Sequence, residues 1–341
     1  MFRLIKSSIN IIKSKGIKRF LFEVKKYLAK NFLYTPIFGL IAYERQRRKN
    51  PLIIQDVQGS KMMLNLENRG ICRDLFLNKG LREPECTRIL KQELRKGMVV
   101  VDIGANIGYY VLQEAKIVGE NGKVYALEPE PANFELLKKN ITLNNYSPDL
   151  VGAYQLAVGD RTGKFSFYIS ENCNWHTMSE LKGEQKSKLK IIDKIEVDTI
   201  TLDGFTENKR PPDFVRMDVE GFEFRILKGM KRMLLANRRI KICMEVHPLL
   251  IEQGGEKAES MLKLLSDYGF NINYLVEEDL NFSFSAIKRR IKEGPIVLSE
   301  KSTEYRKPIK ELLINKKIKN KLIGDESYCL FFGEIMFNTK C

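Results

Sequence analysis

From Met98 onward, short apolar runs alternate with longer stretches whose apolar residues recur at helical spacing. This alternation is typical of a parallel β-sheet that is covered by helices on both faces. The pattern therefore predicts a doubly wound α/β fold. The expected strands are Val99–Ile103, Val124–Leu127, Tyr154–Val158, Phe214–Val219, Ile240–Val246, Phe270–Leu275 and Tyr328–Phe337, and the expected helices are Tyr109–Val118, Pro131–Leu143, Phe222–Ala236 and Glu256–Tyr268.

Other segments depart from this alternation and divide the chain. Residues 51–97 are predicted to form a β-hairpin and a helix that lead into the core domain, residues 98–341. Within that domain, residues 163–201 alternate like an added β-hairpin. Residues 277–327 are rich in Lys and Glu with weak periodicity, and we expect a surface excursion there.

Residues 1–50 form a basic N-terminal arm. They hold thirteen Lys and Arg residues against two Glu residues, so most of the chain's net charge of +15 lies there. The arm also has apolar residues at helical spacing, and its apolar run at 32–43 is shorter than the roughly twenty residues that cross a bilayer. We expect contact with an anionic membrane surface. The alternative is a helix packed on the catalytic domain, with its lysines in water.

The cellular compartment follows from the cysteines and from the start of the chain. Six scattered cysteines without a Cys-x-x-Cys pair indicate neither a disulfide framework nor a zinc site. The first residues lack the apolar core of a secretory signal. We therefore expect a cytoplasmic protein, peripheral on the membrane through its arm.

The first predicted strand ends in a glycine-containing turn that carries Asp102, Gly104, Asn106 and Gly108. Glycines at such a turn let a ligand approach the backbone, and the following helix directs its N-terminal amides at a negative group. Glu128 ends the second strand, where it can accept hydrogen bonds from ribose hydroxyls. The set fits S-adenosylmethionine, with its carboxylate at the helix and its ammonium at Asp102. An ordinary tight turn is the alternative, and a nicotinamide cofactor would require Gly-x-Gly-x-x-Gly.

Together with several further motifs, this turn makes the chain resemble the FkbM family of methyltransferases over roughly residues 55–250. The resemblance implies a seven-strand, Rossmann-like methyltransferase sheet and O-methyl transfer to a hydroxyl or carboxyl group, often on saccharides or natural products. It also places Glu83 on the cofactor side, and Val158 is included in the expected cofactor-binding set. The matching segments are Gly97–Gly108, Val124–Pro129, Leu137–Ile141, Met217–Glu223 and Met244–Pro248, and the motif Asp-Val-Glu-Gly at 218–221 discriminates best.

Three residues are candidates for the chemistry. Asp218 and Glu220 lie at the carboxyl end of the fourth strand, the edge of the sheet where ligands bind, and Asp218 can also cap the next helix. His176 and His247 are the chain's two histidines, and either can accept a hydroxyl proton. The alternative is a loop histidine bonded to backbone or water. Asp218, Glu245 and His247 can also hold a divalent cation, but we expect a site without metal.

The molecule that accepts the methyl group is indicated only in general terms by the sequence. We expect a small molecule or a glycan, including a lipid-linked intermediate. Trp175, the single tryptophan, can stack on a sugar ring, but we expect it to close the small core of the insertion. A tRNA methyltransferase is the main alternative, but base methylation at nitrogen usually brings Asn-Pro-Pro-Tyr where this chain has Asp-Val-Glu-Gly. We therefore expect no nucleic-acid acceptor. A non-catalytic membrane-surface protein is the third hypothesis, and the intact cofactor motif argues against it.

Overall fold

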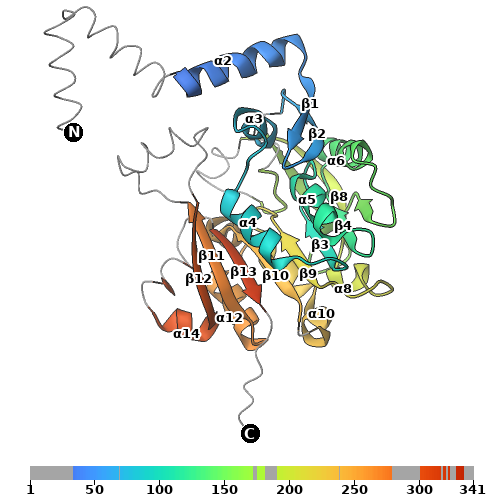
Figure 1. Ribbon diagram of the computed structural model, residues 1–341. Helices are drawn as coiled ribbons and strands as arrows, with labels where there is room; N and C mark the ends of the chain where they lie inside the picture. Colours follow the sequence, from blue (N-terminus) through green and yellow to red (C-terminus); the bar gives the residue numbers. More distant parts are fainter. Residues whose placement is uncertain are drawn as a thin grey trace, which may run out of the picture.

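The computed structural model describes residues 34–68, 70–171, 175–180, 190–237, 239–278, 300–315, 318–319, 322 and 328–333 (Figure 1). Its main sheet has eight strands in the order β12-β11-β13-β10-β9-β3-β4-β5. The strands are β3 (Val99–Ile103), β4 (Lys123–Leu127), β5 (Val151–Tyr154), β9 (Phe214–Met217), β10 (Lys241–Val246), β11 (Asn271–Glu278), β12 (Glu300–Pro308) and β13 (Tyr328–Gly333). The helices are α2 (Tyr34–Lys49), α3 (Ile71–Leu77), α4 (Pro84–Glu93), α5 (Tyr109–Val118), α6 (Pro131–Leu143), α8 (Leu202–Phe205), α9 (Glu223–Lys228), α10 (Lys231–Ala236), α11 (Pro248–Gln253), α12 (Ala258–Asp267) and α14 (Ile309–Ile314).

Helices cover both faces of this sheet, so the predicted doubly wound α/β fold is confirmed. Strands β10, β9, β3, β4 and β5 are parallel, while β13, β11 and β12 continue the sheet in antiparallel pairs. Every residue of β3 is buried. Val100 packs with α5 and α6 on one face, and Val99 and Val101 pack with α9 and α12 on the other. Alternate side chains of one strand therefore serve two separate cores.

The expected surface excursion at 277–327 is wrong in part, because β12 and α14 lie within it. β12 pairs only with β11 in the described part of the sheet, so it is an edge strand. Edge strands are commonly rich in charged residues, which discourage pairing with another chain. The Lys- and Glu-rich sequence of β12 therefore forms a strand although it lacks an apolar run. The sheet of the described residues has eight strands, and seven were expected. Residues 279–299 lie outside the described residues.

Two other predicted elements are divided in the structure. In place of the expected single strand Tyr154–Val158, β5 ends at Tyr154, and Ala157–Val158 forms β6 in a separate three-stranded sheet. The expected helix Phe222–Ala236 is interrupted near Gly229. A Cβ at Gly229 would lie 2.0 Å from the carbonyl oxygen of Gly159, so the backbone packs too closely there for a side chain. The final expected strand is described only as far as Gly333.

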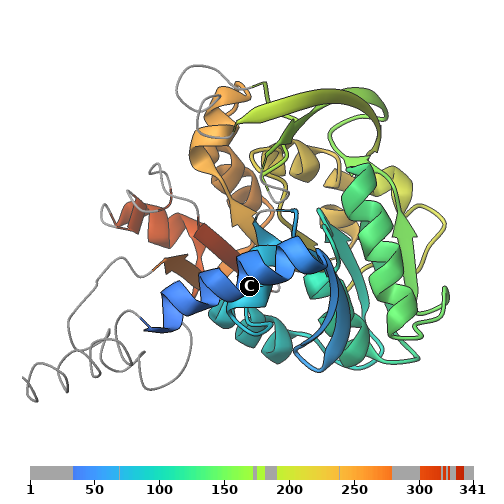
Figure 2. The same ribbon diagram turned by 90° about the horizontal axis from the view of Figure 1, so that it is seen from above.

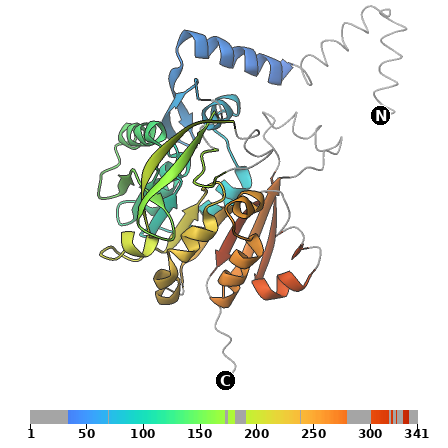
Figure 3. The same ribbon diagram turned by 180° about the vertical axis from the view of Figure 1, so that it is seen from behind.

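The two predicted hairpins are present. β1 (Leu52–Val57) pairs with β2 (Ser60–Asn65), and β7 (Gly163–Ser170) pairs with β8 (Ile191–Ile200). β6 and β7 both pair with β8, so the insertion makes a small sheet of its own. In Figure 3 this hairpin lies in front of the main sheet. The insertion is thus placed to contribute residues to a site at the edge of the core.

Only the end of the basic arm belongs to the described residues, where α2 continues directly into the β1–β2 hairpin (Figure 2). Tyr43 in α2 is buried, and its hydroxyl donates a hydrogen bond to the carbonyl of Leu66 at 2.7 Å. Residues 1–33 lie outside the described residues, so membrane contact by the arm remains a prediction. Among the helices that are described, none has the length and apolarity to cross a bilayer.

Candidate active site

A pocket with about 570 Å³ of open space lies at the carboxyl ends of β3, β4 and β9. In open α/β sheets, ligands bind at this edge. The lining residues are Ile103, Gly104, Asn106, Glu128, Pro129, Asn133, Leu156, Ala157, Val158, Phe167, His176, Met178, Asp218, Val219 and Glu220. Six residues predicted from the sequence are among them, from five separate parts of the chain.

The turn after β3 is fixed by close backbone contacts. Gly104 has a φ of +77°, and a Cβ there would lie 2.1 Å from the carbonyl oxygen of Asp218. The amides of Gly104 and Ala105 both donate to the carbonyl of Leu127, at 2.9 and 3.0 Å. Gly108, with a φ of +93°, caps the start of α5 and lies outside the pocket lining. The turn is therefore held between β4 and β9, with no side chain between Gly104 and Asp218.

Glu128 connects this turn to the end of β4. Its Oε2 accepts a hydrogen bond from the amide of Asn106 at 2.8 Å, and its Oε1 accepts one from the amide of Glu130 at 2.9 Å. Only 4% of the residue is exposed, and this burial raises the pKa of Glu128 to about 8. Each carboxylate oxygen has a further lone pair. Glu128 can thus hold the turn and still accept a hydrogen bond from a bound hydroxyl.

Asp102 lies behind the pocket, not in its wall. It is fully buried, and its Oδ1 accepts a hydrogen bond from Arg216 at 2.9 Å. Arg216 also contacts Asp218 at 3.3 Å and lies over the ring of Tyr110, 4.0 Å from its centroid. Burial raises the pKa of Asp102, and Arg216 opposes that shift. This geometry favours a role for Asp102 in holding Arg216, in place of the expected contact with the cofactor ammonium.

Glu83 also lies outside the pocket lining. Its carboxylate is 2.6 Å from Arg82 Nε and accepts a hydrogen bond from the hydroxyl of Tyr110 at 2.7 Å. Its φ of +44° is left-handed, as are those of Asn106 and Glu220. Strained backbone of this kind gathers at functional sites. Glu83 therefore belongs to a network beside the pocket, and its contact with a cofactor remains a prediction.

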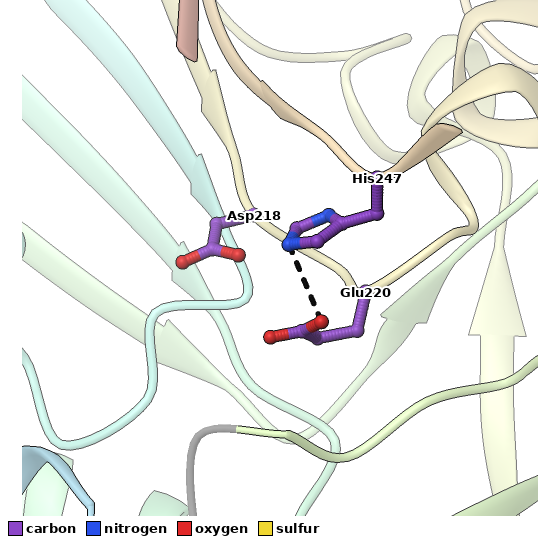
Figure 4. Close-up of side chains that lie close together, drawn as sticks. All are labelled: Asp218, Glu220 and His247. Atoms are coloured by element: carbon purple, nitrogen blue, oxygen red, sulfur yellow. Dashed lines mark ion pairs between the residues drawn. The ribbon is translucent and has the colours of Figure 1, made fainter. Parts of the chain in front are cut away.

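A histidine surrounded by carboxylates, His247, lies beside Asp218 and Glu220 but outside the pocket lining (Figure 4). His247 Nδ1 lies 2.7 Å from Glu223 Oε1, and its Nε2 lies 3.3 Å from Glu220 Oε2 and 3.5 Å from Glu245 Oε1. Burial would lower the pKa of His247, but these carboxylates outweigh it and raise the pKa well above its usual value. Asp218 does not cap a helix, since α9 begins at Glu223 without a side-chain cap. Its carboxylate is free to face the pocket.

The insertion closes the third side of the pocket. His176 Nδ1 accepts a hydrogen bond from the amide of Ser170 at 3.1 Å, and burial lowers the pKa of His176 to about 4. The ring is therefore neutral with its proton on Nε2, which favours hydrogen-bond donation over the expected role as a base. The hydroxyl of Thr177 donates a hydrogen bond to the carbonyl of Glu220 at 2.6 Å. This bond attaches the segment to the part of the pocket wall that carries Asp218 and Glu220. Trp175 does not close a core as expected, since 40% of its surface is exposed.

Sequence reasoning placed Glu220 at the edge of the sheet where ligands bind but gave it no role, and it missed Glu223. Glu220 lines the pocket, and Glu223 fixes the histidine ring. Glu220 belongs to the motif 218–221 that was singled out, so its position beside Asp218 was the available signal. Glu223 ends the matching segment Met217–Glu223, but it was given no role because an acidic residue in the first turn of a helix is ordinarily explained by the helix dipole.

The chain is similar to known methyltransferases over much of its length. It is 27% identical over 187 residues to the hexuronic acid methyltransferase AglP of Haloferax volcanii, which covers 54% of this chain and 68% of that protein. It is 29% identical over 150 residues to methyltransferase 1 of Beauveria bassiana, which covers 38% of this chain and 57% of that protein. A crystal structure of a methyltransferase FkbM from Methylobacillus flagellatus KT aligns with 87% of this chain and 59% of that one, at 13% identity and a TM-score of 0.39.

Residues 102–272, half of the chain, match the methyltransferase FkbM domain. The matched range begins at Asp102 near the end of β3 and includes Asp218, Glu220 and His247. The fold, the pocket and this match agree on one conclusion. The chain is an S-adenosylmethionine-dependent methyltransferase and belongs to the FkbM family.

Proposed function

We propose that the enzyme methylates a hydroxyl oxygen of a saccharide. The observation that carries the proposal is the lining of the pocket, which brings the turn at Gly104 and Glu128 together with the carboxylates of Asp218 and Glu220. A hydroxyl acceptor must lose a proton during methyl transfer, whereas a carboxylate acceptor has none to lose. A wall of proton-accepting oxygens is therefore useful for a hydroxyl and unnecessary for a carboxylate.

Three features support the placement of the cofactor in this pocket. The turn at Gly104 leaves room for a ligand close to the backbone, and α5 directs its first amides toward the same edge of the sheet. Glu128 provides a buried carboxylate for the ribose hydroxyls. Val158 adds an apolar contact in the lining. We assign the cofactor to these residues and to Asn106.

Bound S-adenosylmethionine supplies an electrophilic methyl group on a positively charged sulfur. The protein's task is to hold the acceptor oxygen in line with that methyl group and to remove its proton. Asp218 accepts the proton in this scheme, while His176 donates a hydrogen bond from Nε2 to a neighbouring oxygen of the acceptor. The new bond joins oxygen and methyl carbon, the carbon–sulfur bond breaks, and sulfur keeps its electron pair.

Two observations favour a saccharide. The relative from Haloferax volcanii is named as a hexuronic acid methyltransferase. In this chain the exposed Trp175 adjoins His176 of the pocket wall, and an aromatic face can stack on a sugar ring. The basic residues 1–50 further fit an acceptor held at an anionic membrane surface, such as a lipid-linked glycan.

Replacing Trp175 by Ala is expected to raise KM for the acceptor by about two- to tenfold, as the loss of one aromatic contact implies. The Kd for S-adenosylmethionine should stay unchanged, because Trp175 is not part of the pocket lining. Trp175→Phe is the matched control and should keep most of the affinity. An unchanged KM in the Ala variant would remove Trp175 from the acceptor site.

Product chemistry tests the proposed function. The enzyme is incubated with methyl-deuterated S-adenosylmethionine and a panel of glucosides, glucuronides and glucuronide methyl esters, and labelled products are treated with mild alkali. A methyl ether survives this treatment and a methyl ester does not. We expect labelled, alkali-stable products, including from the esters, whose carboxyl group is blocked. Label that is found only in alkali-labile products would contradict hydroxyl methylation.

A further inference from the structure

We propose that Asp218, Glu220 and His247 bind a divalent cation that holds the acceptor hydroxyl. The proposal rests on the proposed function and adds a metal to the same site, where the sequence predicted none. One ligand atom from each of the three residues lies within 4.8 Å of the others. Figure 4 shows the carboxylates of Asp218 and Glu220 on either side of the imidazole edge. A single ion between them would contact all three.

The orientation of His247 supports a metal ligand. Its Nδ1 is held at 2.7 Å by Glu223, which leaves Nε2 facing Glu220. Histidines that bind metals usually donate their other ring N–H to a carboxylate in this way. Glu223 is itself fixed, because it also accepts a hydrogen bond from the amide of Gly221 at 3.0 Å. The ring is therefore held in one orientation, with Nε2 directed at the site.

The charge of the site supports a cation independently. Asp218, Glu220, Glu223 and Glu245 surround one imidazole, and Glu223 is fully buried with no hydrogen-bond partner for its Oε2 in the described part of the chain. Carboxylates gathered in a buried cluster repel one another unless cations or protons offset their charge. His247 carries at most one positive charge, which leaves an excess of negative charge in the cluster. A divalent cation would cancel it.

The neighbouring arginines do not remove this excess. Arg216 contacts Asp218 at 3.3 Å, but its shorter contact, at 2.9 Å, is with the fully buried Asp102. Arg82 also faces Asp218 and Glu245, but its guanidinium lies 2.6 Å from Glu83 and 3.5 Å from Asp74. Each arginine is therefore already matched by carboxylates outside the cluster.

The ligand set indicates a hard cation of the Mg²⁺ or Mn²⁺ type, since oxygen ligands predominate. Three protein ligands leave coordination positions for water and for the acceptor oxygen. A bound cation acts as a Lewis acid and favours loss of the hydroxyl proton. A carboxylate has two oxygens, so Asp218 can bind the ion through one and accept the proton through the other.

Direct metal binding is the test. Chelator-treated full-length protein is titrated with Mn²⁺ alone and followed by electron paramagnetic resonance, with no cofactor or acceptor present. We expect one tightly bound Mn²⁺ per chain and displacement by excess Mg²⁺. His247→Gln and Glu220→Gln should each weaken binding at least about tenfold, and Glu223→Gln should weaken it about ten- to a hundredfold through the ring. Glu256→Gln, a carboxylate that pairs with Lys228 at 2.6 Å outside the cluster, is the control and should bind normally.

Thermal unfolding of each variant confirms that the protein is folded. Absence of stoichiometric binding by the unmodified protein, or equal binding by the Glu220→Gln variant, would overturn the metal proposal. Its failure can be told apart from failure of the proposed function. Alkali-stable methylation that resists chelators would overturn the metal and keep the function. Site-specific Mn²⁺ binding without hydroxyl methylation would support the metal site and overturn the function.

Discussion

Replacing Asp218 by Asn is expected to lower kcat by about a hundredfold to ten-thousandfold, the range associated with loss of a general base. Asparagine has nearly the same shape but cannot take up the hydroxyl proton. The Kd for S-adenosylmethionine should change little, because the side chain of Asp218 is not among the groups assigned to the cofactor, and Glu128 is unchanged. Single-turnover rates at saturating cofactor, together with calorimetric titration of the cofactor, measure both quantities.

His176→Gln is the informative comparison, because both histidines were candidate bases in the sequence. With Nδ1 occupied by the amide of Ser170, His176 is expected to donate a hydrogen bond, and glutamine retains a donor. We expect a loss of less than about tenfold, below the range for a lost base. A His176→Gln variant as impaired as Asp218→Asn would return the role of base to His176. Full activity in Asp218→Asn would contradict the proposed mechanism.

Above about pH 8, where Glu128 is ionised, replacing it by Ala is expected to weaken S-adenosylmethionine binding by about ten- to 150-fold, which corresponds to the 1.5–3 kcal/mol of a lost charge-assisted hydrogen bond. The amides of Asn106 and Glu130 also lose their acceptor, so the turn that carries Gly104 becomes less well ordered. Calorimetric titration of the cofactor measures the effect. Thermal unfolding distinguishes this local change from loss of the fold.

Glu135→Gln provides the matched control for this measurement. Glu135 is an exposed carboxylate on the next helix that pairs with Lys138 at 2.6 Å and does not line the pocket. Exposed pairs of this kind contribute little to stability. Its substitution should leave cofactor binding intact. Cofactor affinity that is unchanged in Glu128→Ala would remove Glu128 from the cofactor site.

The cofactor side of the site could be predicted because its signals are local. Gly104 and Asn106 lie in one turn, and Glu128 ends the next strand, so the order of strands in a parallel sheet brings them to one edge. The pocket lining contains all three. The same reasoning reached Asp218 and Val158, each of which follows or ends a strand that reaches the pocket.

Contacts between distant residues were the part that the sequence did not reveal. Asp102 and Arg216 are 114 residues apart, and no local pattern indicates that they form a buried pair. Glu223 and His247 come from different elements, and their contact depends on the direction in which α9 leaves the sheet. β12 was hidden because an edge strand with solvent-facing charges lacks an apolar run. In each case the missing information was which distant parts of the chain lie in contact in the folded protein.

The most direct test of the account is a crystal structure of the enzyme with S-adenosylhomocysteine and a saccharide acceptor. The account predicts that the ribose hydroxyls contact Glu128, that the sulfur lies beside Gly104, and that an acceptor hydroxyl faces Asp218 across the pocket. Binding of the nucleoside at another edge of the sheet would contradict the cofactor assignment. An acceptor carboxylate, in place of a hydroxyl, directed at the sulfur would contradict the proposed reaction.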